Sequence, residues 1–159
     1  MQQTITLNTR VQVSDPCLDP GSFEAVLVKD CLPGKWIVSV RRKDCGPAWG
    51  TRIASLTIRH EDYPKGFPKE FVGRCCVDSG QCGFFDEAYY DANQTNEGFD
   101  DPSSWYHRVC QLALSDAEYG VIDDKGAVSA SGYGDGVYGC YAKRNKDGFI
   151  VALTLKFIS

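Results

Sequence analysis

The stretch Phe149-Ile150-Val151-Ala152-Leu153-Thr154-Leu155-Lys156-Phe157-Ile158 decides the fold class of this chain. Side chains alternate between the two faces of a strand, so every second residue from Phe149 to Phe157 falls on one apolar face. Ile150, Ala152 and Ile158 give the opposite face an apolar character as well. A strand that is apolar on both faces is typical of the centre of a covered sheet. We therefore expect residues 149–158 to form a central strand.

Similar short runs rich in Val, Ile, Thr and aromatic residues recur along the chain, bounded by Gly, Pro, Asp and Asn. Such residues fit a pleated, half-buried surface. Together with the last strand, residues 149–158, the strands we predict are Thr4–Val13, Phe23–Lys29, Trp36–Arg42, Arg52–Arg59, Glu70–Asp78, Gly120–Asp123, Ala127–Ser131 and Val137–Arg144. The sequence thus predicts one mainly β domain over residues 1–159, antiparallel and β-sandwich-like, with one or two short helices.

The strongest helix signal begins at Asp101-Pro102, where Asp101 can cap the helix and Pro102 suits its first position. Trp105, Val109 and Leu112 then fall on one helical face. A shorter helix is expected near residues 86–92.

Two connections are typical of β-hairpins. Asp147-Gly148 fits a type I′ turn, which needs positive φ values, and Asp124-Lys125-Gly126 offers a three-residue connection.

Length and composition indicate a globular protein. The chain has 159 residues, 43% of them hydrophobic, and its 17 basic and 21 acidic residues give a net charge of −4. The longest unbroken apolar run, residues 149–153, has five residues, whereas a membrane-spanning helix needs ~20. No basic segment followed by an apolar stretch is visible at Met1, so we expect no secretory signal and a cytoplasmic location.

Charge is spread unevenly along the chain. Residues 1–80 hold 11 basic and 9 acidic residues, and residues 81–159 hold 6 basic and 12 acidic. The stretch from Asp86 to Asp101, which includes Glu97, has six acidic residues and no basic one. A nucleic-acid binder should carry a basic stripe, so no nucleic-acid partner is expected. The acidic stretch indicates a solvated loop or, alternatively, a surface that meets a basic partner.

Eight cysteines are present, and their spacings match no C-x2–4-C metal motif. A chain of this length can build a core without disulfides, so we interpret the cysteines as free thiols that pack in the interior. A disulfide or a metal site remains an alternative.

Two turn-like segments carry the candidate chemistry. Val77-Asp78-Ser79-Gly80 is similar to the D-[ST]-G turn of aspartic proteases, but it also suits a structural turn at a strand end. Ser131-Gly132-Tyr133-Gly134-Asp135-Gly136 can form a β-bulge or a backbone nest that binds a ligand. Asp78, Asp86 and Asp135 could share a cation if their loops converge. H-E-x-x-H, G-x-S-x-G and P-loop motifs are absent.

These segments also carry a resemblance. Residues 71–159 resemble a bacterial and phage domain family of unknown function, which ends in an S-G-x-G-D-G-x-Y motif and a D-G hairpin. An upstream V-D-S-G-x-x-x-F-x-D stretch of that family is matched from Val77 to Asp86. This chain departs from the family at Gly139-Cys140 and at Cys82. The resemblance implies a shared architecture and no particular activity.

We therefore expect a non-enzymatic binding protein, encoded by a phage or mobile element, that sequesters a host-defence component, a toxin or a small nucleotide-like ligand. No catalytic residue, cofactor or membrane contact is expected, and the partner is a protein or a small molecule. The alternative is a metal-dependent hydrolase that uses the three aspartates. The candidate ligand-binding residues are Asp78, Ser79, Gly80, Asp86, Ser131, Gly132, Gly134, Asp135, Gly136 and Tyr138.

Overall fold

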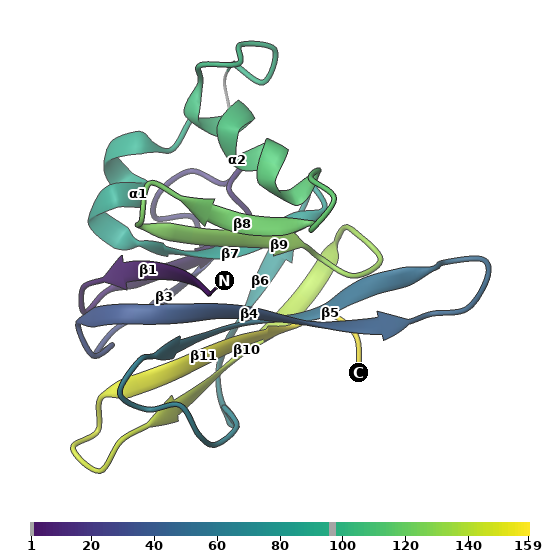
Figure 1. The fold of residues 1–159 in the computed structure, drawn as a ribbon. Coiled ribbons are helices and arrows are strands. Elements are labelled where there is room, and N and C mark those ends of the chain that lie inside the picture. The colour runs from purple at the N-terminus through teal and green to yellow at the C-terminus, as the bar shows by residue number, and fades with distance from the viewer. Residues whose placement is uncertain (1, 96–97) are drawn as a thin grey trace.

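Two antiparallel sheets and two short helices make up the part of the chain that the structure describes (Figure 1). The structure is a computed structural model, and it describes residues 2–95 and 98–159. The larger sheet has the strand order β1-β4-β5-β11-β10-β6, and the smaller has the order β3-β2-β7-β9-β8. The elements are β1 (Gln3–Leu7), β2 (Val11–Ser14), β3 (Val26–Val28), β4 (Gly34–Asp44), β5 (Thr51–His60), β6 (Glu70–Val77), β7 (Gln81–Asp86), α1 (Glu87–Asn93), α2 (Trp105–Ala113), β8 (Tyr119–Ile122), β9 (Gly126–Ala130), β10 (Gly136–Arg144) and β11 (Ile150–Lys156). This arrangement confirms the mainly β, sandwich-like fold.

The main core lies between the two sheets. Leu56, Leu153 and Leu155 of the larger sheet share one buried cluster with Val13 and Phe84 of the smaller sheet. Both helices lie on the other face of the smaller sheet (Figure 1), where Phe85 packs in a second cluster with Tyr90 of α1 and Trp105 of α2. The smaller sheet is therefore covered on both faces, by the helices and by the larger sheet. The larger sheet is covered on one face, by the smaller sheet.

The last strand, β11, is central, as its sequence predicts, because it pairs with β5 on one side and β10 on the other. The predicted alternation fails at its start. Lys143 pairs with Ala152 and Arg144 pairs with Ile150, so Val151 is a bulge residue without a partner. An extra residue in a strand shifts the alternation, so the residues before it point to the face opposite to the one expected. Ile150 therefore joins Leu153 in the core.

Several predicted elements differ from the structure. The predicted strand Thr4–Val13 is two strands, β1 and β2, which belong to different sheets. Strand β7 lies in a segment that was not predicted as a strand. The hairpin before β11 exists, but Gly148 is its positive-φ residue and Asp147 is not, so the type I′ prediction is wrong. Between β8 and β9 the left-handed residues are Asp123 and Asp124.

The two helices differ in how well the sequence predicted their starts. Helix α1 begins after Asp86, whose side chain accepts from the N–H of Tyr89, close to the predicted helix. Helix α2 starts at Trp105, with Ser104 as its cap, and not at Asp101-Pro102. The carboxylate of Asp101 instead accepts hydrogen bonds from the backbone N–H and the hydroxyl of Ser103. It therefore stabilises a turn before the helix.

Five cysteines are buried thiols that fill the interior, and no disulfide joins them: Cys31, Cys75, Cys82, Cys110 and Cys140. Within residues 2–95 and 98–159, the helices are too short and too polar for any to cross a membrane. The acidic stretch is described except for residues 96 and 97, so Glu97 lies outside the described residues.

Candidate functional site

The predicted turn at Asp78–Gly80 is held from below by Asp15, a buried carboxylate that follows β2. Its Oδ2 accepts hydrogen bonds from the backbone N–H groups of Asp78 at 2.8 Å and Ser79 at 2.7 Å, and its Oδ1 accepts from the Ser79 hydroxyl at 2.6 Å. Oδ1 also accepts from the N–H of Cys17. The hydrogen-bond donors of Asp78 and Ser79 therefore donate to a carboxylate of the same chain.

The glycine-rich segment lies directly beside this turn. Asp135 Oδ1 accepts from the N–H of Gly80 at 2.9 Å, and the N–H of Ser131 donates to the carbonyl of Gly80 at 3.1 Å. The Tyr138 hydroxyl closes the loop from within by donating to the carbonyl of Gly134 at 2.6 Å. Two segments that lie about fifty residues apart in the sequence are thus joined by hydrogen bonds. We call residues 78–80 and 131–138 together the bonded corner.

Gly132 and Gly136 serve the packing of that corner. Gly132 has a φ of +62°, and a Cβ there would lie 3.0 Å from atoms of Phe157 and Ile158. A Cβ on Gly136 would approach the Tyr138 hydroxyl at 3.1 Å. These glycines allow close contact with the chain's own side chains.

Asp86 lies at the opposite end of β7 from this corner. It is six positions along the chain from Gly80, which is roughly 20 Å along a strand. Its side chain accepts from the N–H of Asn8 at 3.0 Å and caps α1. The structure therefore brings Asp78 and Asp135 near one another but not Asp86. Among the described residues, no three His, Cys, Asp or Glu side chains are grouped to hold a metal ion.

A hollow of about 510 Å³ borders the same corner, between it and α2. Ser79 and Gly80 line it, together with Tyr106 and Cys110 of the helix. Burial raises the pKa of Tyr106 to about 12, so its hydroxyl stays protonated at neutral pH. Gln81 also lines the hollow, and its Oε1 is buried without a hydrogen-bond partner in the described part of the chain.

A larger depression, about 600 Å³, lies on the outer face of the larger sheet and is lined by none of the predicted site residues. We call it the sheet groove. Its floor is made of hydroxyl side chains on β4, β5 and β11: Ser39, Ser55, Thr57 and Thr154. Thr57 and Thr154 are cross-strand partners, and their hydroxyls lie 2.6 Å apart. The floor therefore carries hydroxyl groups, which can rotate to accept or donate.

Four cationic side chains line the sheet groove: Arg41, Arg59, Lys69 and Lys156. Arg41 donates to the carbonyl of Ile158 at 3.0 Å, and Lys156 lies over the ring of Tyr141, 4.5 Å from its centre. A guanidinium has five N–H donors, so these contacts leave donors available. No acidic side chain lines the groove among the residues that the structure describes.

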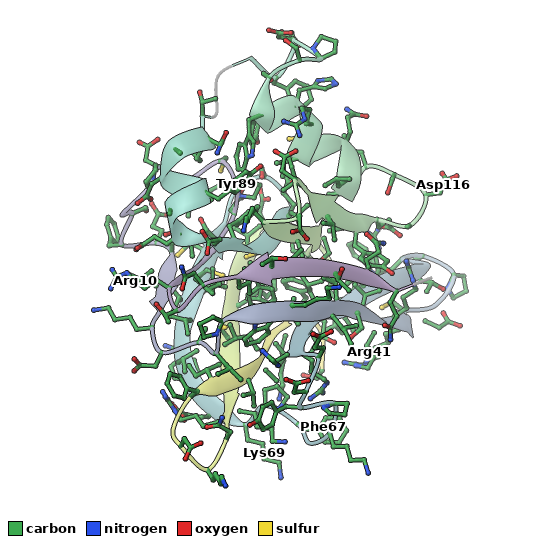
Figure 2. All side chains as sticks on the ribbon, turned by 60° about the vertical axis from the view of Figure 1, so that its left-hand side comes forward. Arg10, Arg41, Phe67, Lys69, Tyr89 and Asp116 are labelled. Carbon is green, nitrogen blue, oxygen red and sulfur yellow. The ribbon has the colours of Figure 1, made fainter. Side chains whose placement is uncertain are left out.

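One wall of the sheet groove is the loop between β5 and β6. Arg59 donates to the carbonyl of Gly66 at 2.6 Å, and Lys143 donates to the carbonyl of Lys65, so strand cations hold this loop over the sheet. Phe67 at its tip lines the groove and is 80% exposed. Figure 2 shows Arg41, Phe67 and Lys69 on one side of the molecule, and Tyr89 and Asp116 beside the helices at the other end.

Residues 54–155, which run from β5 to β11, match the model of a family described as protein of unknown function (DUF4241). The chain belongs to the DUF4241 family. This agrees with the resemblance drawn from the second half of the sequence, at the level of a domain family of unknown function. No curated protein and no solved structure matches the chain significantly.

The DUF4241 match covers both candidate regions in part. It contains the bonded corner and Arg59, Phe67 and Lys69 of the sheet groove, whereas Arg41 and Lys156 lie outside it. Sequence reasoning missed the groove. A signal was present, because Ser39 and Arg41 fall two residues apart, as Ser55, Thr57 and Arg59 do, and period-two spacing places such residues on one face.

Proposed function

We propose that this DUF4241 protein binds a small phosphate-bearing, nucleotide-like ligand in the sheet groove and does not transform it. The observation that carries the proposal is the set of four cationic side chains around a hydroxyl floor, with no acidic side chain in the described lining. Arginine forms paired, charge-assisted hydrogen bonds to phosphate oxygens, and lysine supplies a mobile point charge. A depression of about 600 Å³ is within the range of small-molecule sites.

Phe67 supplies the second part of a nucleotide site. Its ring is largely exposed at the rim of the groove, beside Lys69. An aromatic ring stacks on the face of a base, and such stacking contributes ~1–3 kcal/mol per base. A ligand with a phosphate group among the arginines and a base on Phe67 would therefore use both kinds of side chain.

Binding without turnover is favoured by what the groove offers chemically. Acid–base and nucleophilic catalysis commonly use His, Cys, Asp or Glu, and none of these residue types lines the groove in the described chain. His60 is buried and His107 lies on α2, where its Nδ1 is 2.6 Å from the carbonyl of Phe99. The groove residues can hold an anion, and they include neither a histidine nor a carboxylate side chain in the described chain.

The same proposal includes a cytoplasmic protein of phage or mobile-element origin, whose role is to sequester its ligand. The buried Cys75 and Cys82 thiols, with sulfur atoms 3.2 Å apart, suit a reducing compartment, where such a pair stays reduced. A host-defence component or a toxin is the alternative target that the sequence suggests. The groove favours the nucleotide-like ligand among these targets.

Calorimetric titration with ATP, inorganic tripolyphosphate and adenosine tests the proposal. We expect ATP to bind, and the double variant Arg41→Ala with Lys69→Ala to lose about a hundredfold in affinity, about tenfold per cation. A matched control, Lys29→Ala with Lys146→Ala, removes the same charge outside the groove lining and should bind as the wild type does.

Phe67→Ala separates the two parts of the site. It should weaken ATP binding and leave tripolyphosphate binding unchanged, because only ATP carries a base. If the wild type binds neither ATP nor tripolyphosphate, or if the control loses as much affinity as the groove variant, the proposal is wrong.

A further inference from the structure

The outer face of the larger sheet continues beyond the sheet groove, over β10 and β6. The pairing register carries the row Ser39–Thr57–Thr154 on to Tyr141 of β10 and Phe71 of β6. It carries the row Arg41–Ser55–Lys156 on to Gly139 and Arg74. From β4 to β6 this face crosses four strand spacings, about 19 Å at ~4.8 Å each.

This extension is aromatic and cationic at once. The rings of Phe71 and Tyr141 meet edge to face, 5.7 Å apart, and Phe71 is 49% exposed. The guanidinium of Arg74 lies over the Phe71 ring at 5.2 Å, as the Lys156 ammonium lies over Tyr141. Guanidinium planes and aromatic rings are both surfaces on which unpaired bases stack.

Within the register rows of this face, the charged side chains have one sign. A further register row, through Arg59, Ala152 and Lys143, adds two cations. The three rows therefore hold five cations and no carboxylate: Arg41, Arg59, Arg74, Lys143 and Lys156. Glu70 and Asp78 lie outside the rows, Glu70 in an ion pair with Arg144 and Asp78 beyond the end of β6.

We propose that this face binds single-stranded nucleic acid, with phosphates along the cations and bases on Phe67 and on the Phe71–Arg74 pair. The inference rests on the proposed function, because the sheet groove would hold one nucleotide of the strand. A mononucleotide fills the groove but reaches neither Arg74 nor Phe71. A duplex keeps its bases stacked on one another, so the aromatic side chains favour a single strand.

This proposal departs from the expectation that net charge gave. The chain carries −4 overall, but the fold gathers cations from both halves of the sequence on one face. The potential that a ligand meets depends on the local distribution of charge and not on its sum.

Fluorescence anisotropy with labelled (dT)12, a labelled 12-base-pair duplex and a labelled mononucleotide tests the inference on the full chain. We expect (dT)12 to bind at least tenfold more tightly than the mononucleotide and the duplex. Binding of (dT)12 should weaken from 50 to 200 mM salt, because phosphate contacts release counterions. Equal affinity for the duplex would overturn the single-strand preference.

Three variants locate the strand on the sheet. Arg74→Ala and Phe71→Leu should weaken (dT)12 binding by about threefold to tenfold and leave mononucleotide binding unchanged, while Arg41→Ala weakens both. Arg74 is exposed, so its variant should fold, and thermal melting checks each protein.

The outcomes separate the two proposals. If the mononucleotide binds but (dT)12 binds no more tightly, or if Arg74→Ala and Phe71→Leu have no effect on (dT)12, this inference fails and the proposed function stands. If neither ligand binds, both fail.

Discussion

Asp15 holds Ser79 through two hydrogen bonds at once, from the backbone N–H at 2.7 Å and from the hydroxyl at 2.6 Å. The two residues are 64 positions apart, and Asp15 is fully buried. Asp15 follows β2 of the smaller sheet, and Ser79 lies in the turn that leads from β6 of the larger sheet into β7 of the smaller. This carboxylate thus fixes the place where the chain passes between the sheets.

Removal of the Asp15 carboxylate should destabilise the fold strongly. Asp15→Ala leaves the part-buried N–H groups of Asp78, Ser79 and Cys17 without their acceptor. A donor that loses its partner away from water costs ~1–3 kcal/mol. We expect a loss of about 3 kcal/mol or more in the free energy of unfolding, measured by urea denaturation. Asp78→Ala is the control, because that exposed side chain can be removed while its N–H still donates. Equal losses in both variants would contradict this account.

Gly83 is required where β7 and β9 approach each other. A Cβ at this position would lie 2.2 Å from the carbonyl oxygen of Ala127, a backbone atom that cannot move aside cheaply. Gly83→Ala should therefore cost about 3 kcal/mol in unfolding free energy, at the upper end of overpacking effects. Gly21→Ala, which adds a methyl group in open space at a positive φ, should cost only about 1 kcal/mol. A Gly83→Ala protein as stable as the control would show that the strands separate easily.

Stability should fall in acid partly through Asp123. The Tyr89 hydroxyl, and then the Arg108 guanidinium, hold the pKa of this carboxyl below its usual 3.8. A carboxyl whose pKa is lower in the folded chain stabilises the fold above its unfolded pKa, and that contribution disappears as the pH falls through the folded pKa. The unfolding free energy of the wild type should therefore decline more steeply below about pH 4 than that of Asp123→Asn.

The Asn variant is suited to this comparison, because Asp123 has a φ of 50° and asparagine tolerates that conformation. Chemical denaturation at a series of pH values gives the two curves. Curves that stay parallel from pH 6 to the acid limit would remove Asp123 from the explanation.

The buried thiols should resist modification in the native protein. Burial raises the pKa of Cys31 to about 12, and it raises the pKa values of Cys82 and Cys140 well above the usual value. Since the thiolate is the reactive form, Ellman's reagent at pH 8 should label these residues only after unfolding. Cys45 is partly exposed, and Cys45→Ser should lower the native count by one.

Cys31→Ala provides the matched control for this experiment. Its native count should equal that of the wild type, while its count in guanidinium should be one lower. A native count that drops in Cys31→Ala would mean that the core opens to the reagent.

The fold class could be predicted from local sequence patterns. The misplaced elements show that local patterns do not determine where each strand begins and ends. The apolar run of β11 was sufficient to place it at the centre of a sheet. The segment Thr4–Val13 has strand-forming residues on both sides of Asn8, but the N–H of Asn8 donates to Asp86, and the chain changes sheets there. Strand β7 was hidden because Gly83 interrupts its pattern, although the close approach of β9 requires that glycine.

The candidate site depended still more on long-range pairing. The corner formed by Gly80 and Asp135 joins segments that were each singled out, but their bond could not be read from either one. In the sheet groove, Thr57 and Thr154 become neighbours only through the strand order β5-β11. Summing charge along the chain also concealed the groove, because Lys156 belongs to the acidic half and Arg41 to the other.

The strand order also shows that the residues matched by the family model do not contain all the strands that the two sheets need. Residues 54–155 match the DUF4241 family, yet β5 pairs with β4 and β7 pairs with β2, and both partners precede residue 54. A chain trimmed to the matched residues would leave a row of backbone donors and acceptors open in each sheet. Unprotected sheet edges recruit other strands, so such a fragment should self-associate rather than remain monomeric.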